Sequence, residues 1–245
     1  MQALGIIGGS GLTRLQALTV ERHEVISTPY GEPSAPLTFG RFDGTRVVFL
    51  PRHGSTHSIP PHRVNYRANL WTMREVGIER VIGMAAVGGI TPPMAPGVLA
   101  VPDQVIDYTW GRDHTLFDAD LDSVTHIDFT DPYCEDLRAQ ILAAARGVDI
   151  AVHDGGTYGA TQGPRLESRA EIARMERDGC DVVGMTGMPE AALARELGIC
   201  YACLALSVNW AAGKSDGPIT MGEIDRHLDQ GMGRARTVLA AVAGA

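Results

Sequence analysis

Short apolar runs that stop at glycine-rich or polar turns alternate with helical stretches along this sequence, and this alternation constrains the fold more than any other feature. Residues 4–7 run into the turn Gly8-Gly9-Ser10-Gly11, and residues 47–50 run into a polar, histidine-rich loop at 51–62. Runs of this length indicate buried strands. Strands that alternate with helices predict an α/β fold, here a mixed β-sheet flanked by helices on both sides.

The remaining segments fit the same pattern. Further strands are expected at 80–87, 98–105, 181–185 and 199–206. Helices are expected at 65–76, 137–146, 168–177, 189–197 and 222–242. Residues 107–132 show little periodicity, so we expect a long excursion there. Because the chain has 245 residues and no repeat or linker, a single domain over residues 1–245 is expected.

The composition limits the partners and the compartment. Lys and Arg number 21 against 29 Asp and Glu, a net charge of −8, so no broad cationic surface is expected for nucleic acid or anionic lipid. The N-terminus lacks a basic signal region, and no apolar stretch reaches the ~18 residues of a membrane span. We therefore expect a cytoplasmic protein.

Four cysteines occur, at 134, 180, 200 and 203. A chain of this length needs no disulfide staples, so reduced thiols are expected. Cys200 and Cys203 have the spacing of a redox or metal pair, but they lie within an apolar run that indicates a buried strand. We interpret them as core residues.

Three loops, each placed after an expected strand, suit an anion. The turn at Ser10 offers consecutive backbone amides, and Arg52-His53 places a planar cation beside a titratable imidazole. Thr186 lies at the start of an expected helix, where free amides favour negative charge. A plain turn, a surface pair and an ordinary helix cap are the alternatives. Convergence at one sheet edge would make a site for a small anion.

The histidines of the 51–62 loop raise the question of a metal. His53, His57 and His62 lie close together in sequence, but no carboxylate or cysteine accompanies them and prolines break any helical face. We expect no metal site.

Four ordered motifs carry a family resemblance: GIIGGSGL from residue 5, RHG from 52 with NYRAN from 65, GPR from 163, and MTGMPEAALARE from 185. They resemble the trimeric purine nucleoside phosphorylase and methylthioadenosine phosphorylase family over residues 4 to about 240. The resemblance implies phosphorolysis, in which inorganic phosphate displaces a purine from a nucleoside. It also implies a homotrimer with the active site near a subunit boundary, and no metal or organic cofactor, phosphate being a co-substrate.

The resemblance assigns the phosphate contacts first. Ser10, Arg52, His53, the turn Ala85-Ala86 and Thr186 would hold phosphate, in agreement with the anion loops. Ala85 replaces a residue that is often a hydroxyl in the family. His53 and Asn209 are the residues expected to serve catalysis.

The base pocket is assigned in the same way. Asn209 occupies the purine-reading position, with Trp210 beside it, and Ala211 stands where adenine-specific relatives have a second aspartate. An asparagine amide donates to the O6 of a 6-oxopurine and accepts from N7–H, which an ionised carboxylate cannot do for O6. Glu167 matches a glutamate that grips N1–H, and Leu166 is expected on the ring. The base is therefore expected to be a 6-oxopurine.

The sugar pocket differs from that of inosine and guanosine phosphorylases, which place a histidine against the 5′-hydroxyl. Here the corresponding stretch offers Met221 and Ile224, and a soft apolar pocket suits a 5′-methylthio group. The alternative is that both are core residues of the last helix. Met185 should lie under the ribose, and His126 should reach a neighbouring subunit's sugar pocket.

Together the two pockets predict 5′-methylthioinosine as the nucleoside, with hypoxanthine and 5-methylthioribose 1-phosphate as products. A methylthioadenosine deaminase would be the metabolic partner. The alternatives are a methylthioadenosine phosphorylase that tolerates Asn209 and an inosine/guanosine phosphorylase that tolerates Met221. A non-catalytic purine- or phosphate-binding module is a third alternative.

Overall fold

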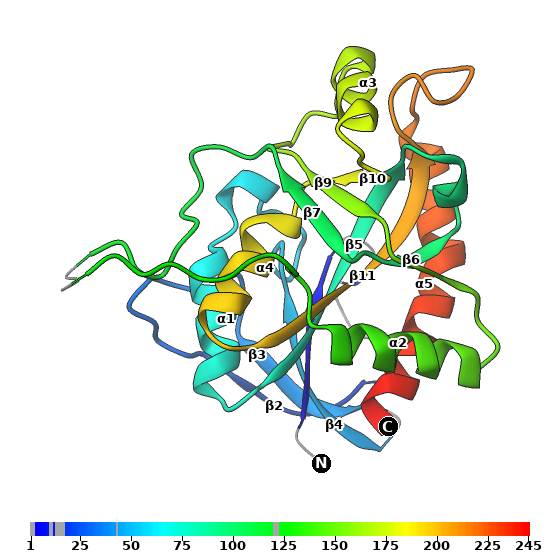
Figure 1. Cartoon of the computed structure of the whole chain (residues 1–245). Helices are drawn as coiled ribbons and strands as arrows, with labels where there is room; N and C mark the ends of the chain where they lie inside the picture. Colours follow the sequence, from blue (N-terminus) through cyan, green and yellow to red (C-terminus); the bar gives the residue numbers. More distant parts are fainter. Residues whose placement is uncertain (1–2, 10–11, 13–17, 43, 120–122) are drawn as a thin grey trace.

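The computed structural model describes residues 3–9, 12, 18–42, 44–119 and 123–245. The described strands form one 11-stranded sheet (Figure 1). They are β1 (Leu4–Gly8), β2 (Leu18–Glu24), β3 (Leu37–Phe42), β4 (Thr45–Pro51), β5 (Arg80–Gly89), β6 (Leu99–Val101), β7 (Gln104–Asp107), β8 (Val152–Asp154), β9 (Thr157–Ala160), β10 (Val182–Gly184) and β11 (Cys200–Trp210). The α-helices are α1 (Tyr66–Glu75), α2 (Glu135–Gly147), α3 (Arg169–Arg177), α4 (Gly187–Glu196) and α5 (Met221–Gly244), with 3₁₀ turns at Pro61–Arg63 and Pro92–Met94.

On one side of the central strand β5, the paired strand changes from β1 to β10. This change leaves a gap beside β5. Strand β1 runs parallel to β5 only as far as the Ile7–Gly83 pair. On the path β2-β3-β4-β1-β5-β10-β9-β7, the next neighbour is β10, which meets β5 antiparallel at Val183–Gly88. Residues 84–87 lie between these two partners, while β11 pairs with β5 along its whole length. Ligands of α/β proteins bind at such switch points.

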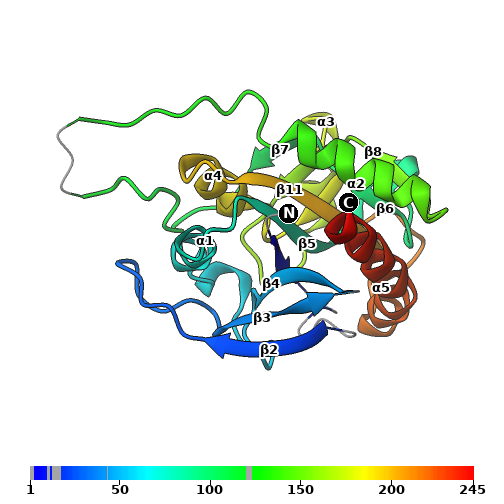
Figure 2. The ribbon, with the colours of Figure 1, turned by 90° about the horizontal axis from the view of Figure 1, so that it is seen from below.

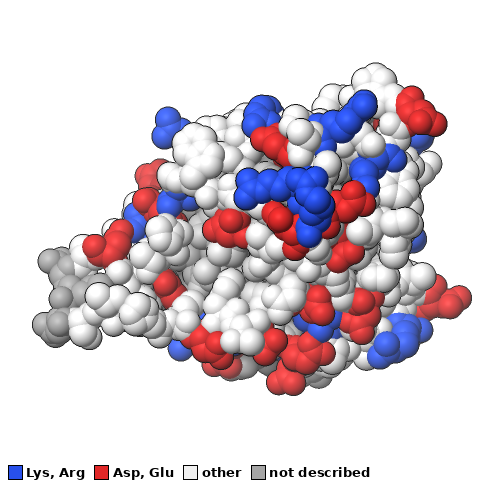
Figure 3. Space-filling view, turned by 45° about the horizontal axis from the view of Figure 1, so that its top comes forward, with Lys and Arg blue, Asp and Glu red and all other residues white. Residues whose placement is uncertain are grey.

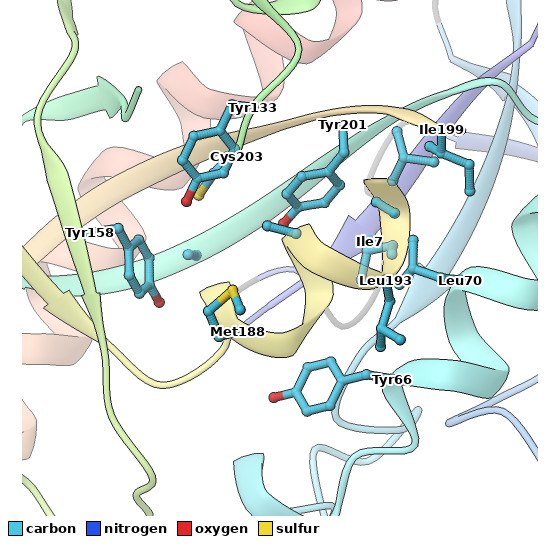
Figure 4. Close-up of a cluster of buried hydrophobic side chains, with 14 of the residues drawn as sticks. Ile7, Tyr66, Leu70, Tyr133, Tyr158, Met188, Leu193, Ile199, Tyr201 and Cys203 are labelled. Carbon is cyan, nitrogen blue, oxygen red and sulfur yellow. The ribbon is translucent and has the colours of Figure 1, made fainter. Parts of the chain in front are cut away.

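Helices cover both faces of this central region, as predicted. Figure 2 shows α1 and α4 on one side of β5 and β11, and α2 and α5 on the other. Strand β11 is apolar over residues 202–206 because it is buried on both faces there. Cys203 and Ala205 join the cluster under α4, while Leu204 and Leu206 join the cluster under α5. Figure 4 shows part of the first cluster, in which Tyr201 of β11 lies with aliphatic side chains such as Leu193 of α4 and Leu70 of α1.

The expected helices are confirmed to within a few residues, and one expected strand is wrong. Residues 98–105 form two strands, because Pro102 lies between β6 and β7 and the two strands have different partners, β8 and β9. Strand β2 was not predicted because it is mostly exposed and polar and has no apolar run.

The expectation of reduced cysteines is also wrong for one pair. Cys134 and Cys200 form a disulfide, 66 residues apart in sequence. The cause is tertiary: the Cys134 amide, directly before α2, donates to the Tyr201 carbonyl at 2.8 Å, which brings the start of α2 onto the start of β11. Cys180 and Cys203 are free and buried, so Cys203 is the core residue expected.

The expected excursion is confirmed: the described residues between β7 and α2 contain neither helix nor strand, and part of this segment extends away from the body (Figures 1 and 2). None of the described helices is long and apolar enough to cross a bilayer. On the face shown in Figure 3, acidic and basic side chains are mixed without a continuous basic area. An anion at this face must be held by local groups.

Candidate active site

A cavity of about 430 Å³ opens at the gap between β1 and β10. This volume is in the range of small-molecule sites. The cavity is lined by residues from the loops after β1, β4, β9 and β10, from β5 and β11, and from the start of α5. The predicted site residues among them are Arg52, His53, Ala85, Ala86, Leu166, Glu167, Met185, Thr186, Asn209, Ala211, Met221 and Ile224. The three anion-suited loops were expected to converge, and those at Arg52-His53 and Thr186 do.

Two predicted residues, Trp210 and His126, are not part of the lining that the described residues form. Ser10 lies outside the described residues, although its neighbour Gly9 lines the cavity. Trp210 follows Asn209 on β11, and successive strand residues point to opposite faces, so its side chain does not share the cavity with Asn209. His126 is exposed on the excursion, where the resemblance expects it to face a neighbouring subunit.

Arg52 is not the free cation that its sequence context suggested. Its guanidinium is 1% exposed, and its Nε and Nη2 each donate to a carboxylate oxygen of Glu190 at 2.6 Å. Its Nη1 donates to the Met84 carbonyl at 2.8 Å, and Tyr201 donates to Glu190 at 2.7 Å. Burial lowers the pKa of Arg52, but the charge of Glu190 and the hydrogen bonds to it outweigh burial and raise that pKa. The guanidinium of Arg52 is therefore a charged hydrogen-bond donor held in a fixed position. The Arg52–Glu190 pair as a whole has little net charge.

His53 is held as a neutral imidazole. Its Nδ1 lies 2.9 Å from the carbonyl oxygen of Ile59, and since a carbonyl only accepts, Nδ1 carries the hydrogen. Burial, and secondarily the charge of Arg52, lowers the pKa of His53 to about 4. Nε2 is then an acceptor, which suits the P–OH group of hydrogen phosphate. Over the described residues, no three histidine, cysteine or carboxylate side chains are grouped as a metal site would need.

This neutral histidine predicts a loss of stability in mild acid. The unfolded imidazole takes up a proton below pH 6.5, whereas the folded one resists protonation down to about pH 4. Because the unfolded state binds more protons in this window, His53's contribution to the free energy of unfolding falls as the pH drops from 6.5 towards 4. Urea unfolding between these pH values would measure it. His53→Gln should show a shallower pH slope, and equal slopes for parent and variant would contradict the assignment.

Thr186 supplies a hydroxyl at the start of α4. It is 8% exposed, and among the described residues its side chain makes no capping hydrogen bond to the helix. Its own amide donates to the hydroxyl of Tyr158 at 3.3 Å. The ordinary-cap alternative is therefore wrong. The hydroxyl is available to an anion beside the positive end of the helix.

The end of the cavity that is expected to receive the base contains an amide and a carboxylate, each held by one hydrogen bond. Asn209 Nδ2 donates to the Trp210 carbonyl at 2.8 Å, which leaves one N–H and the Oδ1 for a ligand. Thr161 donates to Glu167 Oε1 at 2.7 Å and leaves Oε2 open. A side chain on Gly88 would come within 3.4 Å of Asn209 Nδ2, so this glycine provides the room in which the amide sits.

The end of the cavity that is expected to receive the sugar combines a half-buried segment with an open rim. Gly163 has φ +59°, and a Cβ there would lie 2.4 Å from Met185 Sδ, so the loop after β9 closes tightly on Met185. Met221 is 66% exposed at the rim, and the alternative that it is a core residue is therefore wrong. Ile224 is half-buried and packs against the α5 core as well as lining the cavity.

Sequence reasoning missed the buried residues that hold these groups in place. Glu190 was within a quoted motif but had no assigned role. A glutamate amid the apolar residues of an expected helix is a buried charge that needs a cation, and this signal could have pointed to Arg52. Arg112 and Thr161 carried no local signal, because their partners are remote in sequence.

Comparison with known proteins identifies the family to which the chain belongs. A sequence model of the Phosphorylase superfamily matches residues 3–243. The chain belongs to this superfamily. Among phosphorylase relatives, the Probable S-methyl-5'-thioinosine phosphorylase of Pseudomonas syringae pv. tomato is 54% identical over 245 residues, the whole of both chains. The 6-oxopurine nucleoside phosphorylase of Pyrococcus furiosus is 45% identical over 91% of this chain and 85% of its own.

Solved phosphorylase structures agree with the fold. The methylthioadenosine phosphorylase from Schistosoma mansoni in complex with adenine has a TM-score of 0.95 and 30% identity, over all of this chain and 91% of that one. The expected mixed sheet flanked by helices is confirmed.

Proposed function

We propose that this phosphorylase cleaves 5′-methylthioinosine with inorganic phosphate, releasing hypoxanthine and 5-methylthioribose 1-phosphate. The observation that carries the proposal is one cavity with an anion site at one end and the pair Asn209 and Glu167 at the other. The relative that is 54% identical over the full chain bears the name of that activity. The enzyme is further proposed to be a cytoplasmic homotrimer that receives its nucleoside from a methylthioadenosine deaminase.

The phosphate end acts through placed donors rather than net charge. Arg52 retains N–H groups beyond those bound to Glu190, and Thr186 adds a hydroxyl. His53 accepts the P–OH hydrogen, which orients the remaining oxygens toward the sugar. As the glycosidic bond breaks, positive charge develops on the sugar, and the bound phosphate serves as counter-charge and then as nucleophile at C1′.

The base end stabilises the leaving purine. Negative charge moves onto the base as the bond breaks, so a hydrogen bond or proton at N7 lowers the barrier. Once N7 of the leaving base has taken a proton from solvent water, Asn209 Oδ1 accepts from N7–H; the free N–H of Asn209 donates to O6, and Glu167 Oε2 accepts from N1–H. Adenine has no N1 proton and offers an amino group in place of O6, so the same set fits a 6-aminopurine poorly. The Pyrococcus furiosus relative is named for 6-oxopurine nucleosides.

The sugar end prefers an apolar 5′ substituent. Ile219, Met221 and Ile224 line the cavity rim, and none offers a partner to a 5′-hydroxyl. Met221→His is therefore expected to raise kcat/KM for inosine relative to methylthioinosine by about tenfold, because a hydrogen bond replaces an apolar contact. Met221→Leu is the control and should keep the parent preference. An unchanged ratio in both variants would place the 5′ pocket elsewhere.

The test of the function is a balance of products. Purified protein is incubated with methylthioinosine with and without phosphate, and hypoxanthine and the sugar product are quantified. We expect one hypoxanthine per methylthioribose 1-phosphate and no release without phosphate. Release without phosphate would show a hydrolase, and hypoxanthine binding without turnover would show a binding module.

A further inference from the structure

One buried guanidinium joins the loops that form the cavity. Arg112, from the excursion after β7, is 8% exposed. Its Nη2 donates to the carbonyls of Thr161 and Gln162 at 3.1 and 2.9 Å. Its Nη1 donates to the carbonyls of Met185 and Met188 at 2.9 and 2.6 Å. Four backbone carbonyls from two loops thus converge on a single side chain.

Each of these carbonyls belongs to a segment that carries a substrate group. Thr161 follows β9 and holds Glu167 through its hydroxyl. Met185 lines the cavity at the sugar end, and Met188 lies two residues after Thr186 at the start of α4. Strand pairing and the 2.8 Å hydrogen bond from the Thr161 amide to the Gly184 carbonyl bring the two loops side by side, and Arg112 ties them together beyond the strand ends.

Arg112 also reaches the opposite wall of the cavity. Its Nη1 lies 3.3 Å from the hydroxyl of Tyr66, which donates to the carbonyl of Pro61 at 3.0 Å. Pro61 lines the cavity on the side of His53. A single chain of hydrogen bonds thus connects the loops after β4, β9 and β10.

The charge of Arg112 is balanced by carbonyl dipoles. Among the described residues, no carboxylate forms an ion pair with it, in contrast to Arg52 and Glu190. A buried cation is tolerated only when its donors are satisfied. Its removal leaves four carbonyls without this donor, that of Met188 buried and the other three part-buried, and the two loops can then recover hydrogen bonds by moving apart or admitting water.

We propose that Arg112 is a positioning residue for phosphorolysis: it holds the loops of Glu167, Met185 and Thr186 at the separation that one bound nucleoside and phosphate require. The inference rests on the proposed function. Through Arg112, the excursion then positions the loops of the chain's own site. This role is separate from any contact of the excursion with a neighbouring subunit.

The chain provides a matched control in Arg67. This arginine of α1 also ties the excursion to the body, through Asp113 at 2.7 Å and Asp118 at 2.5 Å, and among the described residues none of its side-chain hydrogen bonds goes to either cavity loop. Arg112→Ala and Arg67→Ala both remove an anchor of the same segment. Only the first removes donors from the loops of the site.

The experiment measures kcat and KM for methylthioinosine, phosphate and methylthioadenosine in the parent and both variants, with a thermal unfolding curve for each. Arg112→Ala is expected to lower kcat/KM for methylthioinosine about 100-fold, as misplaced groups do, and to reduce its preference over methylthioadenosine. Methylguanidinium should restore part of that activity and preference, whereas tetramethylammonium should not. Arg67→Ala should change kcat/KM by less than about fivefold.

The outcomes separate the two proposals. Equal losses in both variants, or a lower kcat at unchanged KM and unchanged base preference, would overturn the positioning role. A parent that fails to cleave methylthioinosine would overturn the proposed function instead. If Arg112→Ala does not fold, Arg112→Lys keeps the charge but cannot reach both loops, and parent-like selectivity in that variant would also overturn the role.

Discussion

Asn209→Asp is expected to shift the base preference from methylthioinosine toward methylthioadenosine. A carboxylate loses the N–H that donates to O6 and gains an acceptor for the 6-amino group of adenine. One lost and one gained hydrogen bond together change the relative transition-state stability by about 3 kcal/mol, or about 100-fold in the ratio of kcat/KM values. The ratio is measured with both nucleosides at saturating phosphate.

Two further variants separate recognition from general damage. Asn209→Ala removes donor and acceptor together, so it should lower kcat/KM for both nucleosides. The ratio of the two kcat/KM values should then lie closer to one than in the parent. Glu167 accepts a hydrogen bond from the Thr161 hydroxyl, and Glu167→Gln should lower kcat/KM for the 6-oxopurine nucleoside alone. An Asn209→Asp enzyme that keeps the parent ratio would remove this residue from the specificity argument.

Glu190→Gln is expected to produce the largest loss of stability. The ion pair with Arg52 is almost fully buried, at 1% and 0% side-chain exposure. Glutamine has nearly the same shape but leaves the guanidinium charge uncompensated, which costs about 3–5 kcal/mol. For a chain of this size the melting temperature should fall by about 10 °C.

The matched control is Glu24→Gln. Arg22 and Glu24 form a pair of the same kind at 3.2 Å, but with side chains 55% and 44% exposed. Such a pair contributes less than about 1 kcal/mol, so the melting temperature should hardly move. A Glu190 variant as stable as this control would show that Arg52 finds another counter-charge.

The sequence predicted the parts of the site that depend on local order along the chain. Arg52, His53 and Thr186 follow apolar runs directly. Since β4 and β1 run parallel to β5 while β10 runs antiparallel to it, the carboxyl ends of β4 and β10 meet at the gap along β5. The partners of these residues were not predictable, because they depend on which helix covers which strand. Glu190 reaches Arg52 across 138 positions in sequence.

Two other features could not be predicted from the sequence, because they too depend on tertiary packing. The disulfide between Cys134 and Cys200 depends on the docking of α2 against β11, which no spacing rule encodes. Arg112 lies in a segment without periodicity. Its partners are backbone carbonyls, which every residue has, so the sequence does not indicate them. Met221 was predicted to contribute to an apolar 5′ pocket; it lines the cavity and is 66% exposed.

The central claim is that a 6-oxopurine pocket and an apolar 5′ pocket occur in one cavity. Its most direct test is a competition in which methylthioinosine, methylthioadenosine, inosine and guanosine are present together with phosphate, and the initial rate of loss of each is followed. We predict that methylthioinosine disappears first. Faster loss of methylthioadenosine would contradict the roles of Asn209 and Glu167, and faster loss of inosine or guanosine would contradict that of Met221.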